Sequence, residues 1–134
     1  MRVALVGPEL EENLSLRYLD AALREAGHEP GICEFHEPAQ IPDVAQSILR
    51  FQPALVGLSM VFTGRAREYL ELARVLRENG YQGHITAGGH FAAFNAGRIL
   101  GEHTAVDSVV HGDGEETIVR LLGHLDDPGG VAGV

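Results

Sequence analysis

Small residues stand at two places where the chain leaves an apolar run. Ser59 lies near the end of the run that begins at Ala54, and Gly88-Gly89 follows the run that begins at His84. A glycine has no Cβ, so another group can lie flat against its backbone, and a serine hydroxyl can donate to a buried acceptor. If the two runs are neighbouring strands, these residues line one slot suited to a flat heterocycle inserted edgewise. The alternative is that the glycines make a turn and Ser59 satisfies its own backbone.

A second candidate is the segment from His111 to Glu116, which reads His-Gly-Asp-Gly-Glu-Glu and precedes an amphipathic pattern. Asp113 is a suitable N-cap, because its carboxylate can accept from the free N–H groups of a first helical turn. Glu115 and Glu116 suit the positive end of the helix dipole. Local grounds therefore favour a helix start over a ligand role.

The seven histidines and the single cysteine raise the question of a metal. His90 and His111 follow adjacent predicted strands, but no His-Glu-x-x-His motif or cysteine pair accompanies them. We therefore predict no structural metal site. Cys33 lies inside an apolar run and is predicted to fill core space. Being alone, it forms no internal disulfide, which is typical of a reducing compartment.

These residues depend on an alternation of strands and helices along the chain. Helical patterns, two of them ended by Gly27 and Gly80, separate five short apolar runs. This order predicts an α/β fold with a doubly wound, five-stranded parallel sheet of order 2-1-3-4-5, Rossmann- or flavodoxin-like, with helices on both faces. Ligands in such sheets bind beyond the carboxyl ends of the strands. The predicted strands are Val3–Val6, Pro30–Phe35, Ala54–Met60, His84–Ala87 and Ser108–Val110, and the predicted helices are 12–26, 43–51, 66–79, 93–100 and a last one from Gly114 to about Leu125.

Length and composition indicate one globular domain. The chain has 134 residues, which predicts a single domain over residues 1–125 and a Pro-Gly-Gly-containing linker over residues 126–134. The net charge is −9 and lysine is absent, so nucleic acid and anionic membranes are not expected partners. The first apolar run is too short to span a membrane and lacks signal-peptide features. A cytoplasmic location is expected.

Six segments, in this order and spacing, together resemble the cobalamin-binding domain that lies N-terminal in cobalamin-dependent radical S-adenosylmethionine enzymes. The resemblance covers nearly the whole chain. Each segment alone is weakly specific, whereas the ordered set is fairly specific. The segments are Val3–Pro8, Glu12–Leu19, Ala22–His28, Pro53–Met60, Ile85–Phe91 and Val109–Thr117.

The resemblance implies that cobalamin binds with its dimethylbenzimidazole tail threaded beside Ser59 and Gly88-Gly89. It also implies that the corrin ring lies over the loops after the first, third, fourth and fifth strands. Members of the family use cobalt as a methyl carrier or alongside radical chemistry, most often to methylate unactivated carbon or phosphorus. The cofactor-binding residues implied are Pro8, Glu9, Leu10, Asn13, Leu14, Ser59, Met60, Val61, Phe62, Thr63, Gly88, Gly89, His90, Phe91, Gly112, Asp113, Gly114 and Glu115.

One departure concerns the cobalt ligand. Corrinoid carriers such as methionine synthase place Asp-x-His-x-x-Gly after the first strand, and its histidine ligates cobalt. Here the loop from Gly7 to Asn13 has no histidine, and Glu34-Phe35-His36 follows the wrong strand. The radical enzymes commonly lack the motif too, so we expect base-off cobalamin without a histidine ligand. His90 is a candidate for a contact near cobalt, and no metal ligand is predicted among the protein's own residues.

The resemblance also implies a missing catalytic half. The radical enzymes hold an iron–sulfur cluster with Cys-x-x-x-Cys-x-x-Cys, and one cysteine cannot do so. We expect this chain to be the first domain of a longer enzyme, of methyltransferase type, whose further domain supplies the cluster and S-adenosylmethionine. Alone it is expected to bind cobalamin without turnover.

Three other functions share this predicted fold. A response-regulator receiver needs an aspartate after the third strand and a lysine after the fifth, and this chain has neither. A flavodoxin-like carrier needs a phosphate-binding loop after the first strand, where Glu9, Glu11 and Glu12 would repel a phosphate. A cofactor-free docking module of the same fold stays open.

Overall fold

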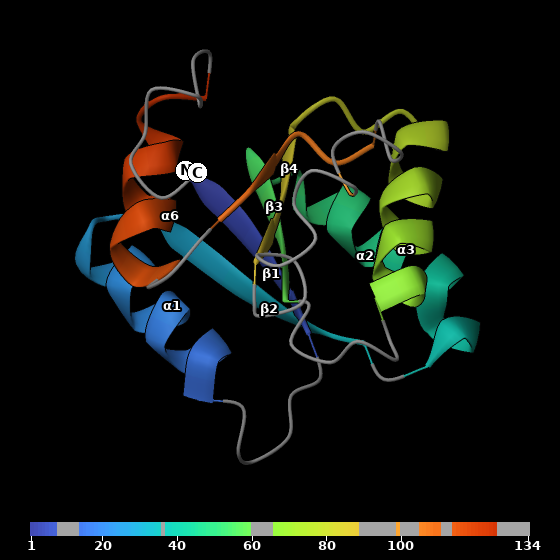
Figure 1. Ribbon diagram of the computed structural model, residues 1–134, viewed down its shortest axis with the longest axis horizontal. Coiled ribbons are helices and arrows are strands. Elements are labelled where there is room, and N and C mark those ends of the chain that lie inside the picture. The colour runs from blue at the N-terminus through green and yellow to red at the C-terminus, as the bar shows by residue number, and fades with distance from the viewer. Residues whose placement is uncertain are drawn as a thin grey trace.

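A five-stranded, wholly parallel sheet forms the centre of the molecule (Figure 1). In this computed structural model the described residues are 1–7, 14–35, 37–59, 66–88, 99, 105–110 and 114–125. The strand order is β2-β1-β3-β4-β5, which confirms the predicted fold class. The strands are β1 (Arg2–Gly7), β2 (Glu29–Glu34), β3 (Leu55–Ser59), β4 (His84–Gly88) and β5 (Ser108–Val109).

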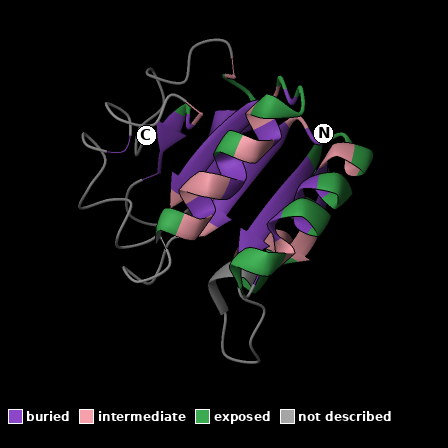
Figure 2. Cartoon of the chain, turned by 90° about the vertical axis from the view of Figure 1, so that its right-hand side faces the viewer, coloured by how far each residue is buried: buried purple, intermediate pink, exposed green. Residues whose placement is uncertain are grey.

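Helices cover both faces of this sheet (Figure 1). Helices α1 (Leu14–Glu25) and α6 (Gly114–Leu122) lie on one face, and α2 (Ile41–Phe51) and α3 (Ala66–Glu78) lie on the other. Each face has its own buried apolar cluster, because alternate strand residues point to opposite sides. Figure 2, viewed from the side of α2 and α3, shows largely buried strands behind helices whose outward sides are exposed. None of the helices that the structure describes is long and apolar enough to cross a membrane.

The helix ends mostly follow the predicted signals. Gly27 and Gly80, which follow α1 and α3, have φ angles of +89° and +92°, a conformation that glycine adopts without strain. Helix α2 ends at Phe51 and is capped by Gln52, a left-handed residue with φ of +53°, which the sequence did not signal. It is preceded by a short 3₁₀ helix, η1 (Pro38–Gln40), that was not predicted either.

Helices α1 and α3 end one residue before their predicted ends, and within the described residues two other predicted bounds differ by two residues or more. Helix α2 begins at Ile41, two residues before the predicted start, with Pro42 in its first turn where a missing N–H costs nothing. Helix α6 ends at Leu122, so Leu125 lies beyond it. The predicted helix over 93–100 lies outside the described residues except for Ile99, which is helical and buried.

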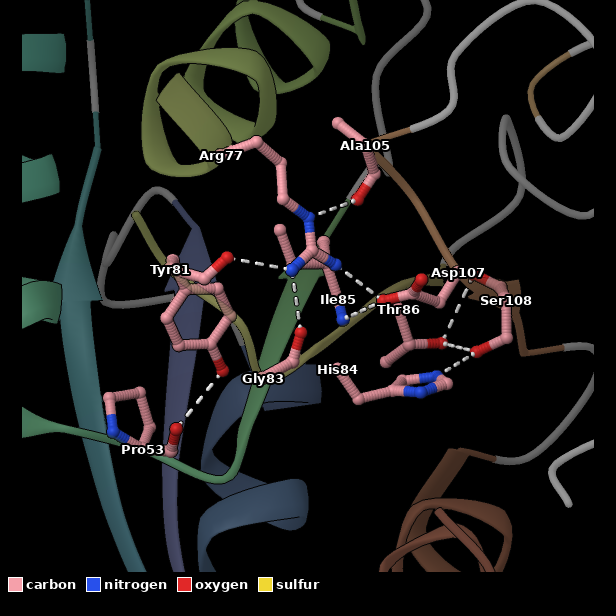
Figure 3. Close-up of polar contacts among 10 residues, drawn as sticks. All are labelled: Pro53, Arg77, Tyr81, Gly83, His84, Ile85, Thr86, Ala105, Asp107 and Ser108. Atoms are coloured by element: carbon pink, nitrogen blue, oxygen red, sulfur yellow. Dashed lines mark hydrogen bonds and ion pairs between the residues drawn. The ribbon is translucent and has the colours of Figure 1, made fainter. Parts of the chain in front are cut away.

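Arg77 of α3 ties the amino ends of β4 and β5 together (Figure 3). Its guanidinium donates to the backbone oxygens of Tyr81 at 2.9 Å, Gly83 at 2.8 Å and Ala105 at 3.2 Å, and it pairs with Asp107 at 2.6 Å. The same Asp107 carboxylate accepts from the N–H of Ile85 at 2.8 Å. This group of contacts lies at the edge opposite the carboxyl ends of the strands, so it fixes the framework rather than a ligand.

Candidate functional site at the carboxyl edge of the sheet

Ser59 and Gly88 end two adjacent strands and lie directly opposite each other. The β3–β4 register pairs Leu55 with His84, Gly57 with Thr86 and Ser59 with Gly88. Both end residues are half-buried. The predicted juxtaposition of the serine hydroxyl and the bare glycine backbone is therefore present at the edge where ligands bind in this type of sheet.

The pair belongs to the sheet face covered by α1 and α6. A Cβ placed on Gly57 would lie 3.4 Å from Leu5 Cδ2 and 3.8 Å from Ile118 Cδ1 of α6. Ser59 is two residues further along β3, so its side chain points to the same face. A Cβ on Gly88 would meet, among the described residues, only Val110 Cβ at 3.9 Å. The space over Gly88 is thus bounded by an apolar wall and left open by the described side chains.

A chain of buried polar groups lies further in on the same face (Figure 3). His84 Nε2 is 2.8 Å from Ser108 Oγ, Ser108 Oγ donates to Thr86 Oγ1 at 2.8 Å, and Thr86 Oγ1 donates to the Ser108 carbonyl at 3.2 Å. Thr86 and Ser108 are paired residues on β4 and β5, each 3% exposed. Buried hydroxyls require hydrogen-bond partners, and the three hydrogen bonds among His84, Thr86 and Ser108 supply them.

The histidine in that chain is neutral in the folded protein at physiological pH. Burial lowers the pKa of His84 below its ordinary value, and the nearby Arg77 lowers it further, while Asp107 acts in the opposite direction. Burial dominates because the charged imidazolium loses hydration.

Most of the predicted binding residues lie outside the described part of the chain. Of the predicted set, only Ser59 and Gly88 are described with their surroundings. Leu14 begins α1, and Gly114 and Glu115 begin α6, so a helix does start where the acidic segment predicted one. The residues outside the described part are Pro8, Glu9, Leu10, Asn13, Met60, Val61, Phe62, Thr63, Gly89, His90, Phe91, Gly112 and Asp113.

Potential metal ligands are scattered among the described residues. No cluster of three histidine, cysteine or acidic side chains occurs among the described residues, and His90 and His111 are not among them. Cys33 of β2 is half-buried and packs against the core beneath α2 and α3. Burial raises the pKa of its thiol, which suits the predicted packing role, since thiolates are the reactive form.

The His84, Thr86 and Ser108 chain was missed by sequence reasoning. Its signal was available, because polar and apolar residues alternate over His84–Ala87 within a strand that was otherwise treated as apolar. A strand buried on both faces is expected to be a continuous apolar run. Polar residues at alternate positions of such a strand indicate a polar patch on one face.

A family model and a curated relative both match nearly the whole chain. The model of the B12 binding domain family matches residues 3–122. An uncharacterized methyltransferase from Pyrococcus horikoshii is 28% identical over 125 residues, which are 92% of this chain and 26% of that protein. The chain therefore spans about a quarter of the length of that curated relative.

Solved structures show the same fold. The methanol:cobalamin methyltransferase complex MtaBC from Methanosarcina barkeri superposes with a TM-score of 0.72 at 15% identity, over 97% of this chain and 46% of that one. A response regulator from Burkholderia multivorans gives a TM-score of 0.63 at 16% identity, over 94% and 95% of the two chains. At such identities the superpositions show the fold alone. The family to which the chain belongs follows instead from the family model. This chain belongs to the B12 binding domain family.

Proposed function

We propose that this chain holds cobalamin in the base-off form, as the cofactor domain of a radical S-adenosylmethionine enzyme that transfers methyl groups. The nucleotide tail enters between the ends of β3 and β4, beside Ser59 and Gly88. The corrin ring lies over the loops at this edge, which include His90 and the other predicted loop residues. When bound, cobalamin supplies a cobalt centre that carries a methyl group.

The pairing of Ser59 with Gly88 is the observation that supports this proposal. A flat heterocycle needs a gap that no side chain fills, and among the described residues only Val110 would lie within 4 Å of a Cβ at Gly88. It also needs a donor for its ring nitrogen once that nitrogen leaves the cobalt, and the Ser59 hydroxyl is such a donor. Apolar contacts from Val110 and Ile118 suit the ring faces. The residues present therefore fit the group.

The role of these residues is to bind and orient. The serine hydroxyl holds the detached base, the glycine lets the base approach the sheet, and the apolar neighbours keep water from the base. With the base held there, cobalt would have no ligand from the nucleotide, and a histidine in the loop after β1 would be the alternative ligand. That loop has no histidine in the sequence, which is why we propose base-off binding without a protein ligand at the metal.

The longer enzyme is the second part of the proposal. Both methyltransferases named above are longer than this chain, and the segment 126–134 has the composition of a linker. We propose that an iron–sulfur domain using S-adenosylmethionine is this chain's partner, in the reducing cytoplasm where Cys33 stays a thiol. The coding sequence beyond residue 134 tests this directly: Cys-x-x-x-Cys-x-x-Cys is expected there, and a different catalytic domain would contradict the radical mechanism.

Cobalamin binding itself is tested by substitution of Gly88 with leucine. The branched side chain enters the proposed tail gap, so retention of hydroxocobalamin after dialysis falls by at least about tenfold, the equivalent of 1.4 kcal/mol. Wild-type protein should give the absorbance spectrum of base-off cobalamin.

The matched control is Gly123→Leu. Gly123 is exposed beyond α6, and a Cβ there would lie 3.5 Å from the Arg120 carbonyl, an ordinary contact. This variant should bind as the wild type does. Equal retention by Gly88→Leu would contradict the position of the slot. A wild-type protein that stays colourless would favour the docking module, and a yellow one would favour the flavodoxin-like carrier.

A further inference from the structure

The hydrogen-bonded chain of His84, Thr86 and Ser108 lies below the proposed tail gap. Thr86 is two residues inward from Gly88 on β4, which at about 3.3 Å per residue is about 7 Å deeper on the same face. Ser108 is beside Thr86 on β5. A bicyclic base that enters edgewise at Ser59 and Gly88 therefore points its far edge toward these two hydroxyls.

The direction of the hydrogen bonds fixes what the two hydroxyls can still do. Thr86 donates its proton to the Ser108 carbonyl, and Ser108 donates its proton to Thr86. His84 must then donate its Nε2–H to Ser108 Oγ, because that oxygen has no second proton to give. Each hydroxyl oxygen has two lone pairs and uses one of them for these contacts. Among the described residues, this patch therefore offers acceptors and no spare donor.

Neighbouring groups keep this polarity in place. Arg77 and Asp107 form an ion pair near the amino ends of β4 and β5. The Asp107 carboxylate also accepts from the N–H of Ile85, the residue that lies between His84 and Thr86 in β4. The carbonyl that accepts from Thr86 belongs to Ser108, a strand residue whose backbone is fixed by pairing. A ligand cannot reverse the direction of these hydrogen bonds without breaking the bond from Thr86 to this carbonyl.

We propose that Thr86 and Ser108, oriented by His84, select corrinoids whose lower base has a hydrogen-bond donor on its six-membered ring. This inference rests on the proposed function and refines it. The dimethylbenzimidazole of cobalamin presents methyl groups at that edge. A hydroxybenzimidazole presents an O–H and adenine presents an exocyclic N–H, and both can donate to the oxygens of Thr86 and Ser108.

Binding of a matched corrinoid series tests the selectivity. The series has dimethylbenzimidazole, hydroxybenzimidazole or adenine as the lower base, and cobinamide, which has no nucleotide tail, completes it. Equilibrium dialysis of the 134-residue chain gives a dissociation constant for each. The wild type should bind a donor-bearing corrinoid about three- to tenfold more tightly than cobalamin, the range of one net hydrogen bond.

Two variants remove the acceptors separately. Thr86→Val and Ser108→Ala should each abolish the preference and leave the affinity for cobinamide unchanged. If the buried valine prevents folding, Ser108→Ala alone decides. Ser47→Ala, at an exposed position of α2 on the other side of the sheet, should retain the preference.

The outcomes separate this inference from the function beneath it. Equal binding of all three tailed corrinoids by the wild type, or a preference that survives Ser108→Ala, overturns the selectivity while cobalamin binding stands. Failure of the wild type to bind any corrinoid, cobinamide included, overturns the proposed function as well.

Discussion

Ser59 and Gly88 have complementary chemical roles at the edge where β3 and β4 end. Glycine contributes space, because a Cβ at this position would have only Val110 within 4 Å among the described residues. Serine contributes a donor at the end of a strand whose other residues are apolar or glycine. Space alone would admit any planar ring, whereas the hydroxyl favours a ring with an accepting nitrogen. The pair is thus more specific than either residue.

The contribution of the hydroxyl is measured with Ser59→Ala. The substitution removes one hydrogen bond and little volume, so the affinity for cobalamin should fall about three- to tenfold. The thermal midpoint should stay close to the wild-type value, because Ser59 is half-buried at a strand end. Isothermal titration and thermal unfolding monitored by circular dichroism check both. If the variant binds cobalamin as tightly as the wild type does, the Ser59 hydroxyl does not hold the base.

The elements hold this edge in place through contacts at the opposite one. Arg77 of α3 donates to three backbone oxygens and pairs with Asp107. Its guanidinium also lies 5.5 Å from the centre of the Tyr81 ring, whose hydroxyl donates to the Pro53 carbonyl at 3.0 Å. Burial raises the pKa of Tyr81 to about 12, so this donor stays protonated. One side chain therefore links helix α3 with the turn before β4 and with the segment that leads into β5.

Replacing Arg77 with methionine should destabilise the fold by about 2–3 kcal/mol. The aliphatic part of the side chain is retained, while the carbonyls of Tyr81, Gly83 and Ala105 lose a charged donor. Urea unfolding measures the loss. The control is Arg74→Met on the same helix, whose exposed pairs with Glu71 and Glu78 contribute little to stability. Equal effects of the two substitutions would show that the Arg77 contacts do not hold the sheet edge together.

The stability of the whole molecule should depend on pH through His84. Burial lowers the folded-state pKa of His84 below its ordinary 6.5, so the unfolded chain binds a proton that the folded chain resists. The free energy of unfolding is therefore highest above pH 6.5. It falls as the pH drops through that value, by at most about 1.4 kcal/mol per pH unit for one proton, until the folded form is protonated too.

A comparison of the wild type with His84→Gln isolates this contribution. Glutamine keeps an N–H donor for Ser108 but does not titrate, so the variant should lose part of the decline in thermal midpoint between pH 7 and pH 5. The pKa of His28 is also lowered, by burial and by the N-terminal amine, and this contribution remains in both proteins. Parallel profiles for the wild type and His84→Gln would mean that His84 does not titrate with unfolding.

The sequence alone predicted the order of the strands, the presence of helices on both faces and the proximity of Ser59 to Gly88. These follow from local patterns, since short apolar runs separated by amphipathic helices leave few parallel topologies. A serine and a glycine at two strand ends become neighbours in any sheet of order 2-1-3-4-5. The glycines at 27 and 80 ended their helices for an equally local reason, a positive φ.

The polar chain beneath the gap and the Arg77 contacts were decided by the tertiary structure. His84 and Ser108 are 24 residues apart, and Arg77 and Asp107 are 30 apart, so no local pattern relates them. They meet because β4 and β5 pair in one register, which also brings Thr86 beside Ser108. Sequence periodicity tells which face a residue takes, but only the packed sheet determines which polar side chain on that face reaches another. That is the physical reason why the meeting of Ser59 and Gly88 was predictable and the hydrogen bonds beneath them were not.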